Sequence, residues 1–261
     1  MKKLLGLGVV FLLMAALPAC TMGAPTKEEI IERMENVDAY TYMLNMKIAT
    51  PYGTSTIKAH EGLDKSKNVS FAEYEVISPG PTIKNTPIKT HSWEFFDGEY
   101  GYSKVVRTED NVSTKESHRW DLNDLKYLLK DFLPANASRE DVIQVITSQR
   151  DYISNILVPL FKNATIEGVE GKGGYYILRF ALQRNGSISE YVEEMRKVEN
   201  ISGEMWVRDG LPTKIHVVHV SSFVEPSSNT THTITKDYNV TFDYRFEIPE
   251  WAKKLREETS G

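Results

Sequence analysis

The chain has 261 residues and a formal net charge of −5, and hydrophobic residues make up 41% of it. This acidic balance argues against a basic surface for nucleic acid, which is therefore not expected as a partner. The single cysteine excludes an intramolecular disulfide.

The first residues are typical of an export signal. Two lysines precede an apolar run from Leu4 to Leu17, shorter than the roughly 20 residues of a membrane-spanning helix. The run ends in Leu-Pro-Ala-Cys, with the cysteine at Cys20. We expect residues 1–19 to be a signal peptide and Cys20 to be lipidated, so that residues 20–25 tether the protein to the outer face of the cell membrane. The alternative is an ordinary secretory signal with an incidental cysteine.

Asparagine usage gives a second indication of export. Eight of the thirteen asparagines begin an Asn-x-Ser/Thr sequon, far more than a random order of the same residues would produce. They are Asn68, Asn111, Asn136, Asn163, Asn185, Asn200, Asn229 and Asn239. Seven of the eight fall where we expect turns or helix ends, which a glycosylating enzyme can reach. Together with a lipidated cysteine they predict an N-glycosylated archaeal surface protein; the alternative is that these residue types are simply common in turns.

The next segment is expected to be a helix followed by a meander of strands. Thr26 and Glu29 form a capping-box pattern, which opens a helix ending near Asp38. From Tyr40 the apolar residues alternate with polar ones, which indicates a strand with one buried face. Further strands are expected over residues 54–63, 69–77, 93–96, 100–106 and 114–120, with the Asp97-Gly98 pair as a hairpin turn.

Helical spacing then interrupts the strands. Residues 124–132 form one expected helix, and Ser138 with Asp141 caps a longer helical stretch to Leu157. Strands resume over residues 164–169 and 175–183, followed by a short amphipathic segment with Tyr191, Val192, Met195 and Val198. The last strands are expected over residues 204–207, 213–224, 231–236 and 240–248.

These elements predict an α+β fold that is mainly antiparallel β. Short hairpins join the strands, and the strand-helix-strand alternation of a parallel sheet is missing. Since nothing in the composition divides the mature chain, we expect a single domain over residues 26–258.

The order of elements resembles that of a known family. Residues 203–215 form a hairpin with Trp206 before the Asp209-Gly210 turn, and residues 240–249 form an alternating closing strand. With the leading helix and the mid-sheet helices, these features look like the lipoprotein-carrier superfamily (LolA/LolB-like, with LppX-like relatives). The resemblance implies a strongly curved half-barrel sheet with an N-terminal helix and covering helices, here residues 124–132 and 139–157, over an apolar face that accepts acyl chains. The anchored relatives fit a lipidated chain better than the soluble carriers do.

Catalytic and metal-binding motifs are missing from the sequence. It has no HExxH, CxxC or Gly-x-Ser-x-Gly pattern, and residues 168–174 indicate a hairpin turn and not a phosphate loop. His216 and His219 are three apart on an expected strand, so they point to opposite faces and cannot bind one metal together. No cofactor, metal or enzyme activity is therefore expected.

The aromatic residues that alternate on the expected strands leave two interpretations open. They either fill a closed core or line an apolar cavity for a hydrophobic ligand. The cavity candidates are Tyr42, Leu44, Met46, Trp93, Phe95, Trp120, Trp206 and Phe242. The leading hypothesis is a surface-anchored envelope lipoprotein that binds a lipid or acyl chain between sheet and helices. The alternatives are a non-enzymatic interaction or scaffold lipoprotein with a solid core and a secreted hydrolase of unrecognised type.

Overall fold

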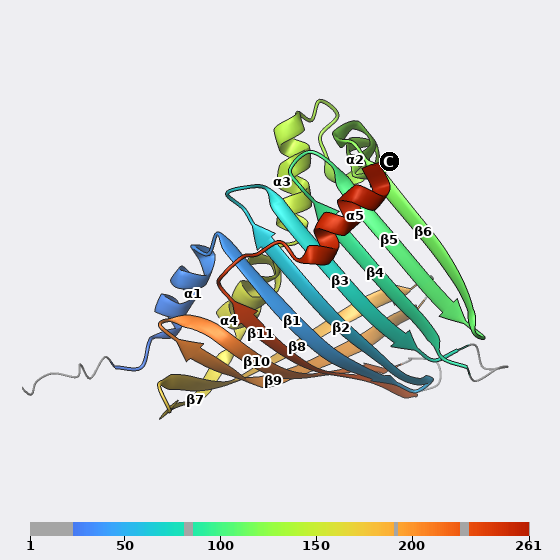
Figure 1. Cartoon of the computed structure of the whole chain (residues 1–261). Coiled ribbons are helices and arrows are strands. Elements are labelled where there is room, and N and C mark those ends of the chain that lie inside the picture. Colours follow the sequence, from blue (N-terminus) through green and yellow to red (C-terminus); the bar gives the residue numbers. More distant parts are fainter. Residues whose placement is uncertain (1–22, 81–85, 191–192, 225–229, 261) are drawn as a thin grey trace, which may run out of the picture.

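The computed structural model describes residues 23–80, 86–190, 193–224 and 230–260. The expected signal peptide and Cys20 lie outside the described residues. The described part forms an eleven-stranded antiparallel sheet with five α-helices, which confirms the predicted α+β class (Figure 1). None of the described helices combines the length and apolarity needed to cross a membrane.

Two meanders of hairpins make up the sheet. The strands are β1 (Ala39–Thr50), β2 (Gly53–Asp64), β3 (Val69–Ser78), β4 (Ile88–Phe96), β5 (Gly101–Glu109), β6 (Val112–Trp120), β7 (Thr165–Lys172), β8 (Tyr175–Glu190), β9 (Glu193–Arg208), β10 (Leu211–Val224) and β11 (Thr231–Asp243). Their order in the sheet is β6-β5-β4-β3-β2-β1-β11-β10-β9-β8-β7. The first and last strands of the chain therefore meet in the middle, where Leu44 pairs with Val240.

The prediction of a strongly curved half-barrel sheet is wrong. The sheet is open and not strongly curled, and β6 and β7 stay at its two opposite edges (Figure 1). Among the described residues, β6 pairs with β5 alone and β7 with β8 alone. The resemblance implied a strong bend that the strand pairing does not produce.

Two expected interruptions of the sheet are also wrong. β9 runs without a break from Glu193, so Met195 and Val198 lie in a strand; Tyr191 and Val192 lie outside the described residues. β11 is one strand where two were expected. In both places residues outside the expected strands are paired across the sheet, as Val198 is with Asn185 and Asp237 with Val218, so the backbone hydrogen bonds of the hairpin outweigh the local pattern.

The capping and turn predictions are confirmed. Thr26 and Glu29 exchange both bonds of a capping box at the start of α1 (Lys27–Glu35). Asp209 and Gly210 have positive φ angles of 52° and 75°, as the two-residue turn between β9 and β10 requires. The Nη1 atom of Arg33 donates to the Asp209 carbonyl oxygen at 2.7 Å, which ties α1 to this turn.

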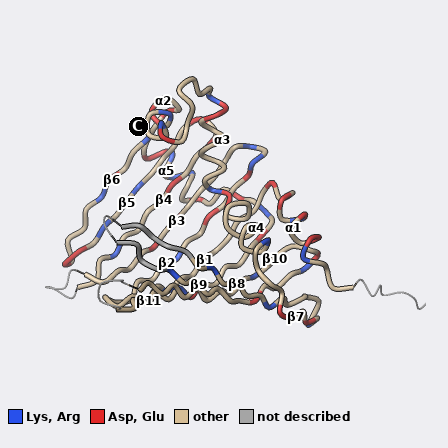
Figure 2. Tube along the Cα trace, turned by 180° about the vertical axis from the view of Figure 1, so that it is seen from behind, with Lys and Arg blue, Asp and Glu red and all other residues tan. Residues whose placement is uncertain are grey.

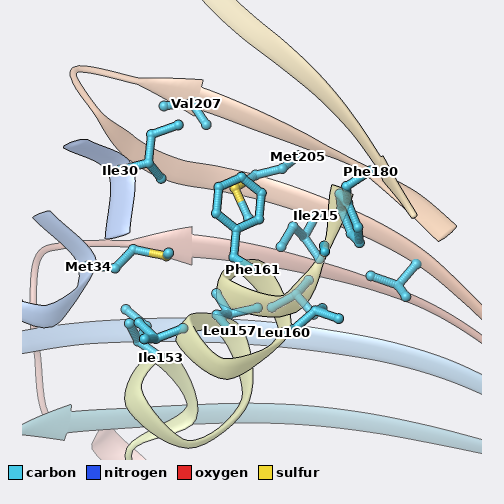
Figure 3. Close-up of a cluster of buried hydrophobic side chains, with 14 of the residues drawn as sticks. Ile30, Met34, Ile153, Leu157, Leu160, Phe161, Phe180, Met205, Val207 and Ile215 are labelled. Atoms are coloured by element: carbon cyan, nitrogen blue, oxygen red, sulfur yellow. The ribbon is translucent and has the colours of Figure 1, made fainter. Parts of the chain in front are cut away.

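One face of the sheet, called the inner face here, carries a solid apolar cluster. It is covered by α1, by the π-helix η2 (Ile153–Leu157) and by α4 (Val158–Asn163). Ile30, Met34 and Phe161 are fully buried there, and Figure 3 shows the Phe161 ring in the middle of the cluster. Side chains of the protein itself therefore fill the space between these helices and the sheet.

The remaining helices lie toward β3–β6. Helix α5 (Glu250–Ser260) packs on the opposite, outer face, where Phe71, Phe95 and Leu255 form a second buried cluster. Helices α2 (Leu122–Leu128) and α3 (Arg139–Gln149), joined through the 3-10 helix η1 (Lys130–Phe132), contact each other. Side chains of α2 and α3 line a pocket against β3–β5.

Candidate functional site

An apolar pocket of about 250 Å³ lies between the inner face of β3–β5 and helices α2 and α3. Phe96 and Val105 come from the strands, and Leu125 and Ile146 come from the two helices. The other residues lining this apolar pocket are Ser70, Phe71, Glu94, Phe95, Gly101, Tyr102, Ser103, Trp120 and Arg150. Its mostly apolar lining suits a hydrophobic group.

A second pocket of about 340 Å³, called the tyrosine pocket here, adjoins the first at Arg150. Three phenol rings, of Tyr42, Tyr74 and Tyr152, stand around it, and the Tyr42 and Tyr152 ring centres are 4.6 Å apart. The remaining lining residues are Glu61, Gln149, Arg150, Asp151, Asn155 and Ile156. This pocket is therefore much more polar than its neighbour.

Arg150 is the shared wall of the two pockets. It caps the C-terminus of α3, and its guanidinium forms an ion pair with Glu94 of β4. Its Nη1 donates to the Tyr74 hydroxyl at 3.0 Å and lies 3.9 Å from a carboxylate oxygen of Glu61. The positive charge of Arg150 is thus already balanced by carboxylates.

Glu61 is an unusual residue for its position. Along β2, the residues that face inward are apolar at Ala59 and Leu63, yet Glu61 lies between them and is only 8% exposed. The phenols of Tyr42 and Tyr74 lie beside its carboxylate, and the charge of Glu61 helps to raise the pKa of both. A buried carboxylate needs such partners to offset its lost hydration.

The phenols of the tyrosine pocket are held in their neutral form. Burial, opposed by Arg150 and reinforced by Glu61, raises the pKa of Tyr74 to about 12. Burial also holds the pKa of Tyr42 and of Tyr152 well above the ordinary value, and Glu61 adds to both shifts. These groups can donate hydrogen bonds, but they are poor bases or nucleophiles near neutral pH.

Asp151 fastens the tyrosine pocket to the sheet. Its carboxylate forms a 2.7 Å ion pair with Lys65 and accepts a hydrogen bond from the Ser154 hydroxyl. Burial alone would raise the pKa of Asp151, but these partners outweigh it and the pKa is lowered. Asp151 is therefore a charged, fully engaged structural group.

The eight predicted cavity residues do not gather at one place. Phe95 and Trp120 line the apolar pocket, and Tyr42 lines the tyrosine pocket. Leu44 and Phe242 pack against the solid inner cluster, and Met46 lies two residues beyond Leu44 on the same strand face.

The other two predicted cavity residues face away from both pockets. Trp93 packs with the outer cluster and donates to Glu73 at 3.0 Å. Trp206 lies between the inward-facing Met205 and Val207, and Lys214 covers its ring. Trp93 and Phe95 share the outward-facing positions of β4, so the alternation along a strand does not by itself decide which aromatic residues border a pocket.

The sequons divide into two groups. Asn68, Asn111 and Asn136 lie in turns and Asn163 ends α4, as expected; Asn229 lies outside the described residues. Asn185, Asn200 and Asn239 lie inside β8, β9 and β11, so the expectation of turns or helix ends for seven of the eight is wrong. The strand pairing puts these three on the outer face, away from both pockets.

Charge and metal chemistry give no competing site. Figure 2 shows acidic and basic residues intermixed along the strands and helices. Among the described residues, no group of three or more His, Cys, Asp or Glu side chains is placed to hold a metal. His216 bonds to Asp237 at 3.0 Å and His219 to Glu199 at 3.1 Å, so each ring has its own carboxylate partner.

Comparison with known proteins adds little. No protein-family model matches the chain, and no curated protein does. Among solved structures, it is similar to a DUF1329 family protein from Desulfovibrio piger ATCC 29098, with 14% sequence identity and a TM-score of 0.25. The match covers 85% of this chain and 93% of that one. A likeness this low carries no argument about function.

Sequence reasoning missed the residues that define the site. Glu61, Tyr74, Arg150 and Tyr152 come from three separate segments that only the fold brings together. One signal was available, because a glutamate among inward-facing apolar residues of a strand is unusual.

Proposed function

We propose that this chain is an exported lipoprotein, anchored at the outer face of the membrane through Cys20, that binds a hydrophobic ligand in the apolar pocket. The observation that carries the proposal is the apolar pocket itself, which lies between sheet and helices on the face where a cavity was expected. The resemblance to the lipoprotein-carrier superfamily supports an acyl chain as the ligand class.

The size of the apolar pocket limits the ligand. Binding sites for small molecules are usually about 300–1,000 Å³, and the volume here is slightly below that range. One short or partly inserted chain therefore fits better than a whole lipid. Each methylene removed from water contributes about 0.8 kcal/mol, so even a short chain supplies useful affinity without any charged contact.

A solid inner cluster supports a second candidate. Ile30, Met34 and Phe161 leave no room under α1 and α4, as expected for an interaction or scaffold lipoprotein. In that case the apolar pocket would be a minor packing feature, and a partner protein would bind elsewhere. The two candidates differ in whether purified protein carries lipid.

The test uses residues 26–261, purified without detergent, and native mass spectrometry with lipid extraction. Val105→Trp places a large ring in the apolar pocket, and Val106→Trp is the matched control because the next residue on β5 points to the outer face. We expect acyl species to co-purify with the wild type and with Val106→Trp but not with Val105→Trp. A clean apo mass for all three, after exposure to a lipid extract, would favour the scaffold.

A further inference from the structure

The ionisable groups around the tyrosine pocket carry an excess of negative charge. Three carboxylates, those of Glu61, Glu94 and Asp151, face two cations, Arg150 and Lys65. Lys65 is committed to Asp151, and Arg150 to Glu94, with Tyr74 and Glu61 as further partners. Glu61 has the longest ion pair of the three carboxylates, since its nearest guanidinium nitrogen is 3.9 Å away.

This arrangement disfavours an anionic ligand. A phosphate or carboxylate would have to replace Glu94 or Glu61 on Arg150, leaving a poorly hydrated carboxylate behind. It would also be repelled by Glu61, which is 8% exposed and therefore weakly screened by water.

The same arrangement favours a cation. Phenol rings attract a cation positioned over their faces, most strongly where water is excluded. Tyr42, Tyr74 and Tyr152 line the pocket that Glu61 also lines, so one ammonium group can lie close to aromatic rings and a carboxylate together. Arg150 does not cancel this attraction, because its charge is already balanced.

The position of Arg150 links this charge preference to the apolar pocket. Its side chain lines both cavities, so a ligand passing Arg150 would have an apolar end against Phe96 and Ile146 and a polar end among the tyrosines. Such a ligand is an amphiphile with its tail on one side of the guanidinium and its head on the other.

We infer that the tyrosine pocket is the head-group subsite for an amphiphile whose tail occupies the apolar pocket, and that it selects an ammonium head over a carboxylate or phosphate head. The inference rests on the proposed function, which supplies the tail. Glu61 is the residue that sets the selectivity, and the three phenols provide the aromatic wall.

Three probes with the same tail and different heads test the inference: decyltrimethylammonium, decyl maltoside and decanoate. Isothermal titration of residues 26–261, below each probe's micelle concentration, should give decyltrimethylammonium an affinity at least about tenfold higher than that of decanoate. The maltoside should lie between them. Comparing the three heads on the wild-type protein needs no variant to fold.

Variants then locate the selectivity. Glu61→Gln keeps the shape of the side chain and should bring the ammonium-to-carboxylate ratio close to one, with little change for decyl maltoside. Glu75→Gln is the matched control, since Glu75 lies on the outward-facing positions of β3 and pairs with Lys58 at the surface. The control should keep the wild-type ratio, and thermal unfolding checks that both variants are folded.

The outcomes separate the two proposals. Decanoate binding as tightly as decyltrimethylammonium, or more tightly, would overturn the head-group inference and leave the apolar pocket as a binding site. A wild-type ratio in Glu61→Gln would also overturn it. Failure of all three probes to bind would count against the proposed function itself.

Discussion

The hydroxyl of Tyr40 donates a hydrogen bond to Oδ1 of Asp151 over 3.1 Å, and the same hydroxyl accepts one from the backbone N–H of Ile153. Tyr40 lies near the start of β1, and the other two residues lie at the entrance to η2. These two buried hydrogen bonds hold the π-helix η2, and with it one wall of the tyrosine pocket, against the middle of the sheet.

Removing the Tyr40 hydroxyl should loosen this connection. Tyr40→Phe leaves Asp151 and the Ile153 N–H one partner short, which should lower the free energy of unfolding by about 1.5 kcal/mol. Urea unfolding followed by tryptophan fluorescence measures the change. Tyr52→Phe is the control, because Tyr52 is 82% exposed and should behave as wild type. Equal urea midpoints for the two variants would show that the hydrogen bonds of the Tyr40 hydroxyl do not stabilise the fold.

Acid should weaken the protein partly through Asp151. The pKa of Asp151 in the folded protein lies below its ordinary value of 3.8, because Lys65 and Ser154 outweigh the effect of burial. A lowered pKa means that the carboxylate stabilises the fold above its unfolded pKa and that this contribution is lost as the pH falls through the folded value.

The Asp151→Asn variant lacks this titrating group and should have a lower free energy of unfolding than the wild type at pH 7. Below about pH 4, its free energy of unfolding should fall less steeply than that of the wild type. Urea midpoints over an acid series measure the slope. Asp131→Asn, at an exposed site in η1, should keep the wild-type slope. An Asp151→Asn profile parallel to the wild type would contradict the role assigned to this carboxylate.

Gly203 should tolerate no side chain. A Cβ at this position in β9 would overlap the carbonyl oxygen of His216 on β10 and the ring of Phe180 on β8. Gly203→Ala should therefore destabilise the fold by about 1–3 kcal/mol, as overpacking does. Gly168→Ala is the control, since nothing lies within 4 Å of the added methyl there. Thermal unfolding of the two variants gives the comparison, and similar midpoints would argue against close packing at Gly203.

Two neighbouring residues of η2 should differ sharply in their contribution to stability. Leu157 is 1% exposed within the inner cluster, whereas Ile156 is 46% exposed at the rim of the tyrosine pocket. Leu157→Ala should cost about 2–5 kcal/mol and Ile156→Ala under about 1 kcal/mol. Denaturant titration measures both. A small loss for Leu157→Ala would mean that the cluster collapses around the missing side chain.

The proposed lipid anchor has a direct test in cells. We expect Cys20→Ser to move the protein from the membrane fraction to the soluble fraction or the medium and to lower its intact mass by that of the acyl groups. Asn200→Gln, in an outward-facing sequon, should lower the mass by one glycan and leave the protein at the membrane. Retention of Cys20→Ser at the membrane would remove the basis for a lipidated cysteine.

Local signals in the sequence predicted local structure well. The capping boxes at Thr26 and Ser138 and the turn at Asp209-Gly210 are confirmed, because each depends on residues within a few positions of one another. The sequence could not predict the pairing of β1 with β11 or the open shape of the sheet, because both depend on contacts between residues far apart in the chain.

The candidate site was predicted less well for the same reason. Alternation identified Tyr42, Phe95 and Trp120, which do line the pockets, but it could not tell which face of each strand the helices would cover. Arg150 gave no signal, since an arginine at a helix end usually points to solvent. Only the packing of α3 over β2–β4 brings it to Glu61 and Glu94.

The seam between β1 and β11 has a consequence for how this molecule reaches its native state. Within each run of hairpins, residues 39–120 and residues 165–243, every strand pairs with a neighbour in sequence. The two runs join only when β1, the first strand of the chain, pairs with β11, the last. Such distant pairing makes folding slow. Until β11 pairs with it, the edge of β1 exposes unpaired backbone N–H and C=O groups, so we expect the chain to be most prone to aggregation before the two runs join.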